Sequence, residues 1–129
     1  MEVGIIGLPL AGKTTIFNAL TRSQAQTDAY GSHKGGINIA VVDVPDARVG
    51  MLSGMFKPRK TVYAKVQFSD VSGVAKGQAQ GTGLDVAVLT ALSKCDALLE
   101  AVRAFEDHQV AHPDGSVDAV RDLNALRFE

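Results

Sequence analysis

The strongest chemical signal lies near the N-terminus, where residues 7–14 read GLPLAGKT and match the pattern G-x-x-x-x-G-K-[ST]. Gly7 and Gly12 allow the main chain to wrap closely, so that successive N–H groups point at one anion. Lys13 can neutralise β- and γ-phosphate oxygens, and the Thr14 hydroxyl is the expected Mg²⁺ ligand. A plain glycine turn would not require Lys-Thr at this place. The pattern therefore predicts a phosphate loop over 7–15, with nucleotide contacts from Leu10, Ala11, Gly12, Lys13, Thr14 and Thr15.

A second signal is the sequence DVSG at residues 70–73, at the end of an expected strand. Asp70 can hold Mg²⁺ directly or through water, and the Gly73 N–H can meet the γ-phosphate. Taken alone, this short motif equally fits an aspartate that caps a strand end. Its position after a phosphate loop favours the nucleotide site, with Lys13 and Gly73 as catalytic residues and Thr14 and Asp70 as metal ligands.

Hydrophobic periodicity supplies the elements that would position these residues. Apolar runs predict strands over 3–6, 37–44, 62–68 and 97–105, the third near a sheet edge and the fourth central. Helices are predicted over 13–22, 46–57 and 84–92, and a last one buries Val120, Leu123 and Leu126. Asp46 and Ser116 are the predicted caps of the second and last helices. Strands alternating with helices predict a three-layer α/β/α sheet, with long loops at 23–36 and 73–83.

Composition and charge limit the number of domains, the partners and the cellular compartment that we expect. The chain has 129 residues, 46% of them hydrophobic and 21% charged, which suits one folded domain. Its net charge of −1 creates no global field toward DNA or an anionic membrane, and no apolar run approaches the length of a bilayer span. The single cysteine, Cys95, cannot form an intrachain disulfide and is read as a small buried side chain. These features predict a cytoplasmic protein that binds neither membrane nor DNA directly.

Several segments together resemble a known family: GLP at 7–9, GKTTIFNALT at 12–21, VPDAR at 44–48, DVSGV at 70–74 and VRAFED at 102–107. They are similar to the YchF (Obg-like ATPase) branch of the translation-factor P-loop NTPases, over nearly the whole chain. The resemblance implies a Ras-like G domain, here partial over 1–129, with switch I at 23–36 and switch II at 70–83. It also implies a cytosolic NTPase that uses Mg²⁺ and ATP or GTP, whose larger relatives associate with ribosomes and commonly favour ATP.

The sequence also departs from the usual pattern of such proteins. Val74 stands where many small GTPases have the glutamine that orients the attacking water, so turnover should be slow or depend on another group. Lys34 aligns with the switch threonine, with Ser32 and Thr27 as the nearest hydroxyls, and it either reaches the phosphates or is a solvated loop lysine. Leu10-Ala11 replace Asn-Val, which leaves the loop N–H groups unchanged.

No base-reading motif occurs before Glu129, so the choice between ATP and GTP stays open. We expect the chain to be a fragment of a longer domain, whose open sheet edges favour self-association.

Three functions fit these patterns. The first is Mg²⁺-dependent hydrolysis of ATP or GTP by a ribosome-associated switch, and the second is a nucleotide-gated binding module without turnover. A P-loop small-molecule kinase is the third, although no arginine-bearing lid is visible.

Two weaker signals remain. The basic turn at 57–60 either touches ribosomal RNA or is solvated. A metal site at His108 and His112 is disfavoured by Pro113 and the nearby turn.

Overall fold

The computed structural model describes residues 1–23, 37–71 and 86–128. Strands and helices alternate along the chain, and the fold is a mixed α/β sheet with helices on both faces. The strands are β1 (Glu2–Gly7), β2 (Ile37–Asp43), β3 (Lys65–Val71) and β4 (Ala97–Ala101). The helices are α1 (Lys13–Thr21), α2 (Ala47–Phe56), α3 (Val86–Leu92) and α4 (Ala119–Phe128).

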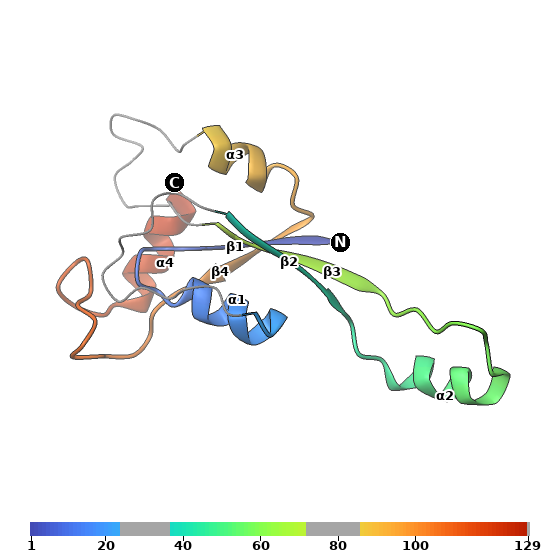
Figure 1. The fold of residues 1–129 in the computed structure, drawn as a ribbon. Coiled ribbons are helices and arrows are strands. Elements are labelled where there is room, and N and C mark those ends of the chain that lie inside the picture. Colours follow the sequence, from blue (N-terminus) through green and yellow to red (C-terminus); the bar gives the residue numbers. More distant parts are fainter. Residues whose placement is uncertain (24–36, 72–85, 129) are drawn as a thin grey trace.

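The described strands form one sheet in the order β2-β3-β1-β4. β1 pairs in parallel with both β3 and β4, whereas β2 runs antiparallel to β3. α1 and α3 lie on opposite faces of this sheet, which gives the layered arrangement that the sequence predicts (Figure 1). The parallel strands therefore bring the ends of β1 and β3, and the segments that follow them, to one edge of the sheet.

Each face of the sheet has its own apolar cluster. On the α1 face, buried Ile5, Phe17 and Ala101 pack together. On the other face, Leu8 and Val71 pack against Val88 of α3 and Leu126 of α4. Packing thus holds β1 and α1 through Ile5 and Phe17 on one face, and the turn between them through Leu8 on the other.

β3 lies between β1 and β2, so its predicted place near a sheet edge is wrong. Its pairing with β1 begins only at Gln67, whereas Lys65 and Val66 pair with β2 alone. The half-exposed alternation in the sequence comes from this N-terminal part of β3, which extends past the N-terminal end of β1. The remainder of β3 is central, and Ser69, Asp70 and Val71 are buried.

The prediction that β4 is a central strand reaching residue 105 is also wrong for the described part of the chain. β4 has one described neighbour, β1, and Leu98 on it is about half exposed. The strand ends at Ala101 because the chain then curves around the Arg103 side chain, which binds the backbone carbonyls of Phe105, Asp107 and Val110.

The predicted N-cap of α2 is confirmed, whereas the predicted N-cap of α4 is wrong. Asp46 caps α2, since its carboxylate accepts a hydrogen bond from the Arg48 N–H at 2.9 Å. In α4 the cap is Asp118 and not Ser116: Asp118 Oδ1 accepts from the N–H groups of Val120 and Arg121. The predicted buried side of α4 is only partly confirmed: Val120 is exposed, whereas Leu126 lies in the core.

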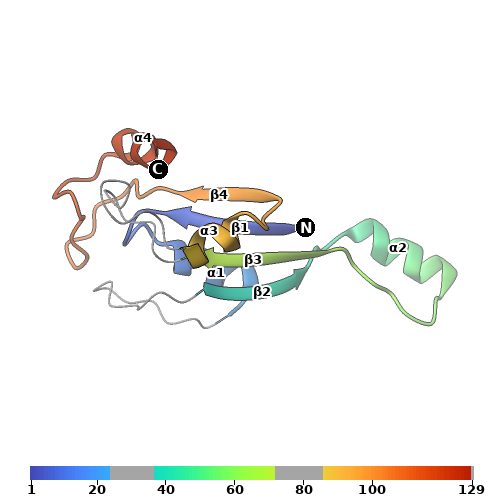
Figure 2. The same ribbon diagram turned by 90° about the horizontal axis from the view of Figure 1, so that it is seen from above.

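α2 stands apart from the rest of the fold. In Figure 2 it lies beyond the ends of β2 and β3, off both faces of the sheet. No α2 residue is buried, and the Met51, Leu52, Met55 and Phe56 side chains of its apolar side are exposed. No helix in the described part of the chain has the length and apolarity to cross a membrane.

Candidate nucleotide site

The turn between β1 and α1 is held in an unusual backbone shape. Leu10 has a φ of 62° and Gly12 a φ of 91°, both in the left-handed region, which residues other than glycine rarely adopt. Gly12 is the N-cap residue of α1, and as a glycine it has no side chain that could accept from the N–H groups of the first helical turn. This is the arrangement in which a helix start offers backbone donors to an anion.

Lys13 folds back over this turn. Its Nζ donates hydrogen bonds to the backbone oxygens of Gly7 at 3.0 Å and Leu8 at 2.9 Å. The residue is only 9% exposed, which is rare for a lysine. The ammonium group is therefore fixed by the turn's own carbonyls, close to the first residues of α1.

Burial changes the acidity of this group. Desolvation lowers the pKa of Lys13 below the ordinary lysine value, and the nearby Asp70 carboxylate offsets part of that effect. A polyphosphate beside the ammonium would favour the charged form further. The energetic cost of burying this cation thus makes the turn receptive to an anion.

Gly7 is required by packing. A Cβ placed on Gly7 would lie 2.4 Å from the backbone oxygen of Ala101 in β4, which is far inside van der Waals contact. The first glycine of the loop therefore permits the close approach of β1 and β4. By contrast, a Cβ on Gly12 would meet nothing within 4 Å, so that glycine is needed for its positive φ.

Asp70 lies fully buried at the end of β3 and faces the start of α1. The Thr14 hydroxyl donates to Asp70 Oδ2 at 2.7 Å, and Asn38 Nδ2 approaches the same oxygen at 3.4 Å. Asp70 Oδ1 is buried, and none of the residues that the structure describes gives it a hydrogen bond. An unsatisfied buried carboxylate oxygen beside a threonine hydroxyl is the oxygen-rich donor set that Mg²⁺ prefers, so these residues fit that ion.

The structure thus brings Lys13, Thr14 and Asp70 together, with Ala11 buried beside them and Leu10 and Gly12 shaping the turn. The Thr15 side chain is exposed, so only its backbone could serve a nucleotide. Gly73, Val74, Lys34, Ser32 and Thr27 lie outside the described residues, as do both loops expected to act as switches apart from Ser23, Asp70 and Val71. Asn38 was missed by sequence reasoning, because its approach to Asp70 depends on the register of β2 against β3.

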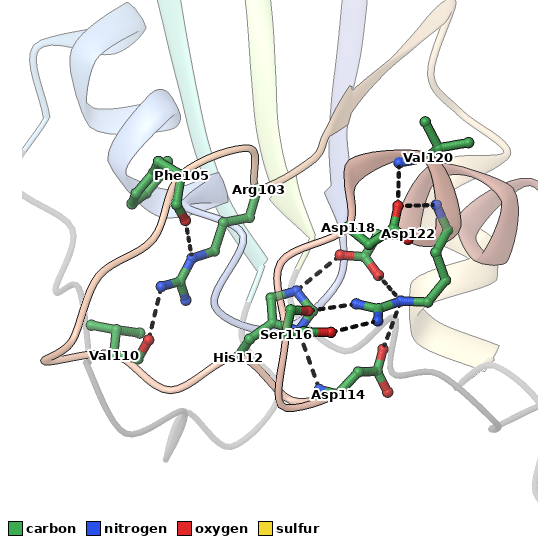
Figure 3. Close-up of polar contacts among 10 residues, drawn as sticks. Arg103, Phe105, Val110, His112, Asp114, Ser116, Asp118, Val120 and Asp122 are labelled. Carbon is green, nitrogen blue, oxygen red and sulfur yellow. Dashed lines mark hydrogen bonds and ion pairs between the residues drawn. The ribbon is translucent and has the colours of Figure 1, made fainter.

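A second polar cluster, formed by Arg103, His112 and Asp122, lies beside the turn (Figure 3). His112 Nε2 and Asp122 Oδ2 are 2.9 Å apart, with side chains 6% and 3% exposed. The Asp114 N–H donates to His112 Nδ1, which assigns the ring proton to Nε2. This buried pairing, and the exposed position of His108, argue against the shared His108–His112 metal site. Among the described residues, no three His, Cys, Asp or Glu side chains gather closely enough to hold a metal ion together.

Arg103 completes the cluster. Its guanidinium donates to the carbonyls of Phe105 and Val110 and lies over the Phe105 ring, 5.2 Å from the centroid. Its buried Nη1 has no hydrogen-bond partner in the part of the chain that the structure describes. The three residues of the cluster lie close to Leu8, Pro9 and Ala11 of the turn, with which they line one shallow depression. Sequence reasoning placed Arg103 in a strand and assigned no role to Asp122, because neither the end of β4 nor the approach of α4 is visible in local periodicity.

The parallel strands, the turn between β1 and α1 and the Lys13–Thr14–Asp70 grouping define the class of P-loop NTPase domains. A family model described as "50S ribosome-binding GTPase" matches residues 2–126, and the chain belongs to that family. The predicted resemblance to YchF and Obg-like ATPases is confirmed over the whole chain.

Both sequence comparison and structure comparison support this assignment. The chain is 36% identical over all its 129 residues to "Ribosome-binding ATPase YchF" of Bacillus subtilis, and 42% identical to "Obg-like ATPase 1" of Caenorhabditis elegans. It covers 35% and 33% of those two proteins. Among solved structures, that of the Schizosaccharomyces pombe YchF GTPase matches 98% of this chain and 34% of its own with 36% identity and a TM-score of 0.66. The chain spans about a third of the length of these relatives.

Proposed function

We propose that this chain binds a nucleoside triphosphate, ATP or GTP, together with Mg²⁺, and hydrolyses it slowly as part of a cytoplasmic, ribosome-associated switch. One observation carries the proposal: the Lys13 ammonium is fixed over the turn, and the neighbouring Thr14 hydroxyl binds Asp70, whose second carboxylate oxygen has no partner among the described residues. These groups complement the charges of a Mg²⁺-triphosphate, because the Lys13 ammonium would meet the phosphates and the Asp70 carboxylate would meet the metal ion.

The proposed roles combine that geometry with the two sequence motifs. Backbone N–H groups of residues 10–15 bind the phosphates, and Lys13 stabilises negative charge on the β- and γ-phosphate oxygens. Thr14 and Asp70 would hold Mg²⁺, which neutralises phosphate charge when bound. Gly73 is proposed to donate its N–H to the γ-phosphate. Because Val74 cannot orient water, slow turnover is expected without a partner.

The test is single-turnover release of γ-phosphate from ATP and from GTP, with and without purified ribosomes. Slow basal release that ribosomes accelerate supports the proposal, and Lys13→Ala should abolish both rates. Because Val74 replaces the usual glutamine, a second candidate is a nucleotide-gated binding module. Tight nucleotide binding with no phosphate release under either condition would favour that module.

A further inference from the structure

The segment 44–64, which we call the α2 arm, is a structured projection from the sheet (Figure 1). Its two stems are joined where the Val44 N–H donates to the Ala64 oxygen at 2.8 Å, and the Lys65–Asp43 ion pair at 2.6 Å closes its base. Hydroxyls of Ser53 and Thr61, 2.6 Å apart, tie the helix to the returning segment. The arm is therefore preorganised, although α2 buries none of its residues.

The arm carries an excess of positive charge in a chain whose net charge is −1. Four cations, Arg48, Lys57, Arg59 and Lys60, accompany a single carboxylate, Asp46. Arg48 already pairs with that carboxylate at 2.7 Å. Among the residues that the structure describes, none forms an ion pair with Lys57, Arg59 or Lys60, and all three are exposed.

Apolar side chains lie directly beside this unbalanced charge. Phe56 is 75% exposed and Met55 74%, and Phe56 immediately precedes Lys57 at the end of α2. An exposed aromatic ring next to cations is the combination that binds single-stranded nucleic acid, since the ring stacks on a base while the cations meet phosphates.

We propose that the α2 arm binds RNA at an unpaired segment, with Phe56 stacking on a base and Lys57, Arg59 and Lys60 contacting the phosphate backbone. The proposal deepens the ribosome association of the proposed function and rests on it. A second copy of this chain fits poorly, because it would bring like charges together. An anionic membrane fits less well than RNA, because Gly50 and Gly54 interrupt the apolar side of a helix of only 10 residues.

The experiment titrates the whole chain into a fluorescein-labelled oligouridylate of about 12 nucleotides and follows anisotropy at several KCl concentrations. Three phosphate contacts should give a plot of log affinity against log salt with a slope of about −2. Substituting Lys57, Arg59 and Lys60 together by Gln should weaken binding at least about tenfold and flatten the slope. Phe56→Ala should weaken binding about five- to a hundredfold with an unchanged slope.

The matched control removes the same charge elsewhere, by changing exposed Arg22, Lys94 and Arg127 together to Gln; it should keep wild-type affinity. Circular dichroism melting checks that each variant folds. The proposal is overturned if wild type does not bind the RNA, if both triple variants weaken binding equally, or if only phosphatidylserine vesicles are bound. Nucleotide affinity, measured on the same variants, should not change, so failure of the RNA proposal is distinguishable from failure of the nucleotide site.

Discussion

Thr14 donates its hydroxyl proton to Asp70 Oδ2 over 2.7 Å, although 56 positions separate the two residues in sequence. The contact joins the first turn of α1 to the end of β3 and holds the carboxylate by Oδ2. Within residues 1–23, 37–71 and 86–128, no group binds the other oxygen, Oδ1. The two segments on which the proposed site depends are therefore already coupled through one hydrogen bond.

We expect Thr14→Ala to reduce the gain in nucleotide affinity that Mg²⁺ provides by about tenfold, because the hydroxyl is both a proposed metal ligand and the partner of Asp70. The measurement is titration calorimetry with ATP in Mg²⁺ and in EDTA. Thr15→Ala is the matched control, since its neighbouring side chain is exposed. Equal Mg²⁺ dependence in the two variants would contradict the assignment.

Lys13→Ala should weaken triphosphate binding at least about tenfold, because a charge-assisted hydrogen bond contributes about 1.5–3 kcal/mol. Titration calorimetry again provides the affinity, and circular dichroism establishes that the variant remains folded. An affinity equal to that of wild type would remove Lys13 from the site.

Lys13 should also produce an alkaline pH dependence. Burial lowers its pKa in the folded chain, so the unfolded chain binds this proton more tightly. Between the lowered pKa and the ordinary lysine value, unfolding takes up a proton, and the free energy of unfolding therefore rises with pH. Urea melts across this window should show that rise in wild type relative to Lys13→Met. A constant difference between the two proteins would show that the group titrates normally.

Gly7→Ala should destabilise the chain by about 1–3 kcal/mol, because its Cβ would collide with the Ala101 oxygen of β4. Gly54→Ala offers a contrast. Its Cβ meets nothing within 4 Å and the position is helical, so alanine should stabilise by up to about 1 kcal/mol. Chemical denaturation measures both, and the close contact is refuted if Gly7→Ala melts like wild type.

Asp122→Ala should cost about 1.5–3 kcal/mol of stability, because it leaves the buried His112 Nε2–H without its acceptor. Glu106→Gln, at an exposed position in the preceding loop, should leave the melting curve unchanged. If the two variants have the same thermal midpoint, the His112–Asp122 contact contributes nothing to the fold.

The β1–turn–α1 unit and the Asp46 cap of α2 could be predicted because each depends on a few adjacent residue types. The position of β3 and the end of β4 could not. The first depends on strand register, and the second on a loop that folds around Arg103, whose side chain binds the carbonyls of Phe105, Asp107 and Val110. The choice of Asp118 over Ser116 as a cap escaped prediction for a related reason. Both residue types cap helices, and only the three-dimensional start of α4 separates them.

The same contrast holds for the candidate site. The grouping of Lys13, Thr14 and Asp70 was expected from motif spacing. Asn38 and the His112–Asp122 pair were not, because antiparallel pairing of β2 and docking of α4 bring them into place.

Because the carbonyls of Gly7 and Leu8 already hold the Lys13 ammonium, the proposed triphosphate would meet this cation in a fixed position. We therefore expect the association rate to depend on diffusion and ionic strength more than on rearrangement of this side chain. The same contacts should limit substitution, because the planar guanidinium of arginine does not reproduce the compact ammonium from which both carbonyls accept.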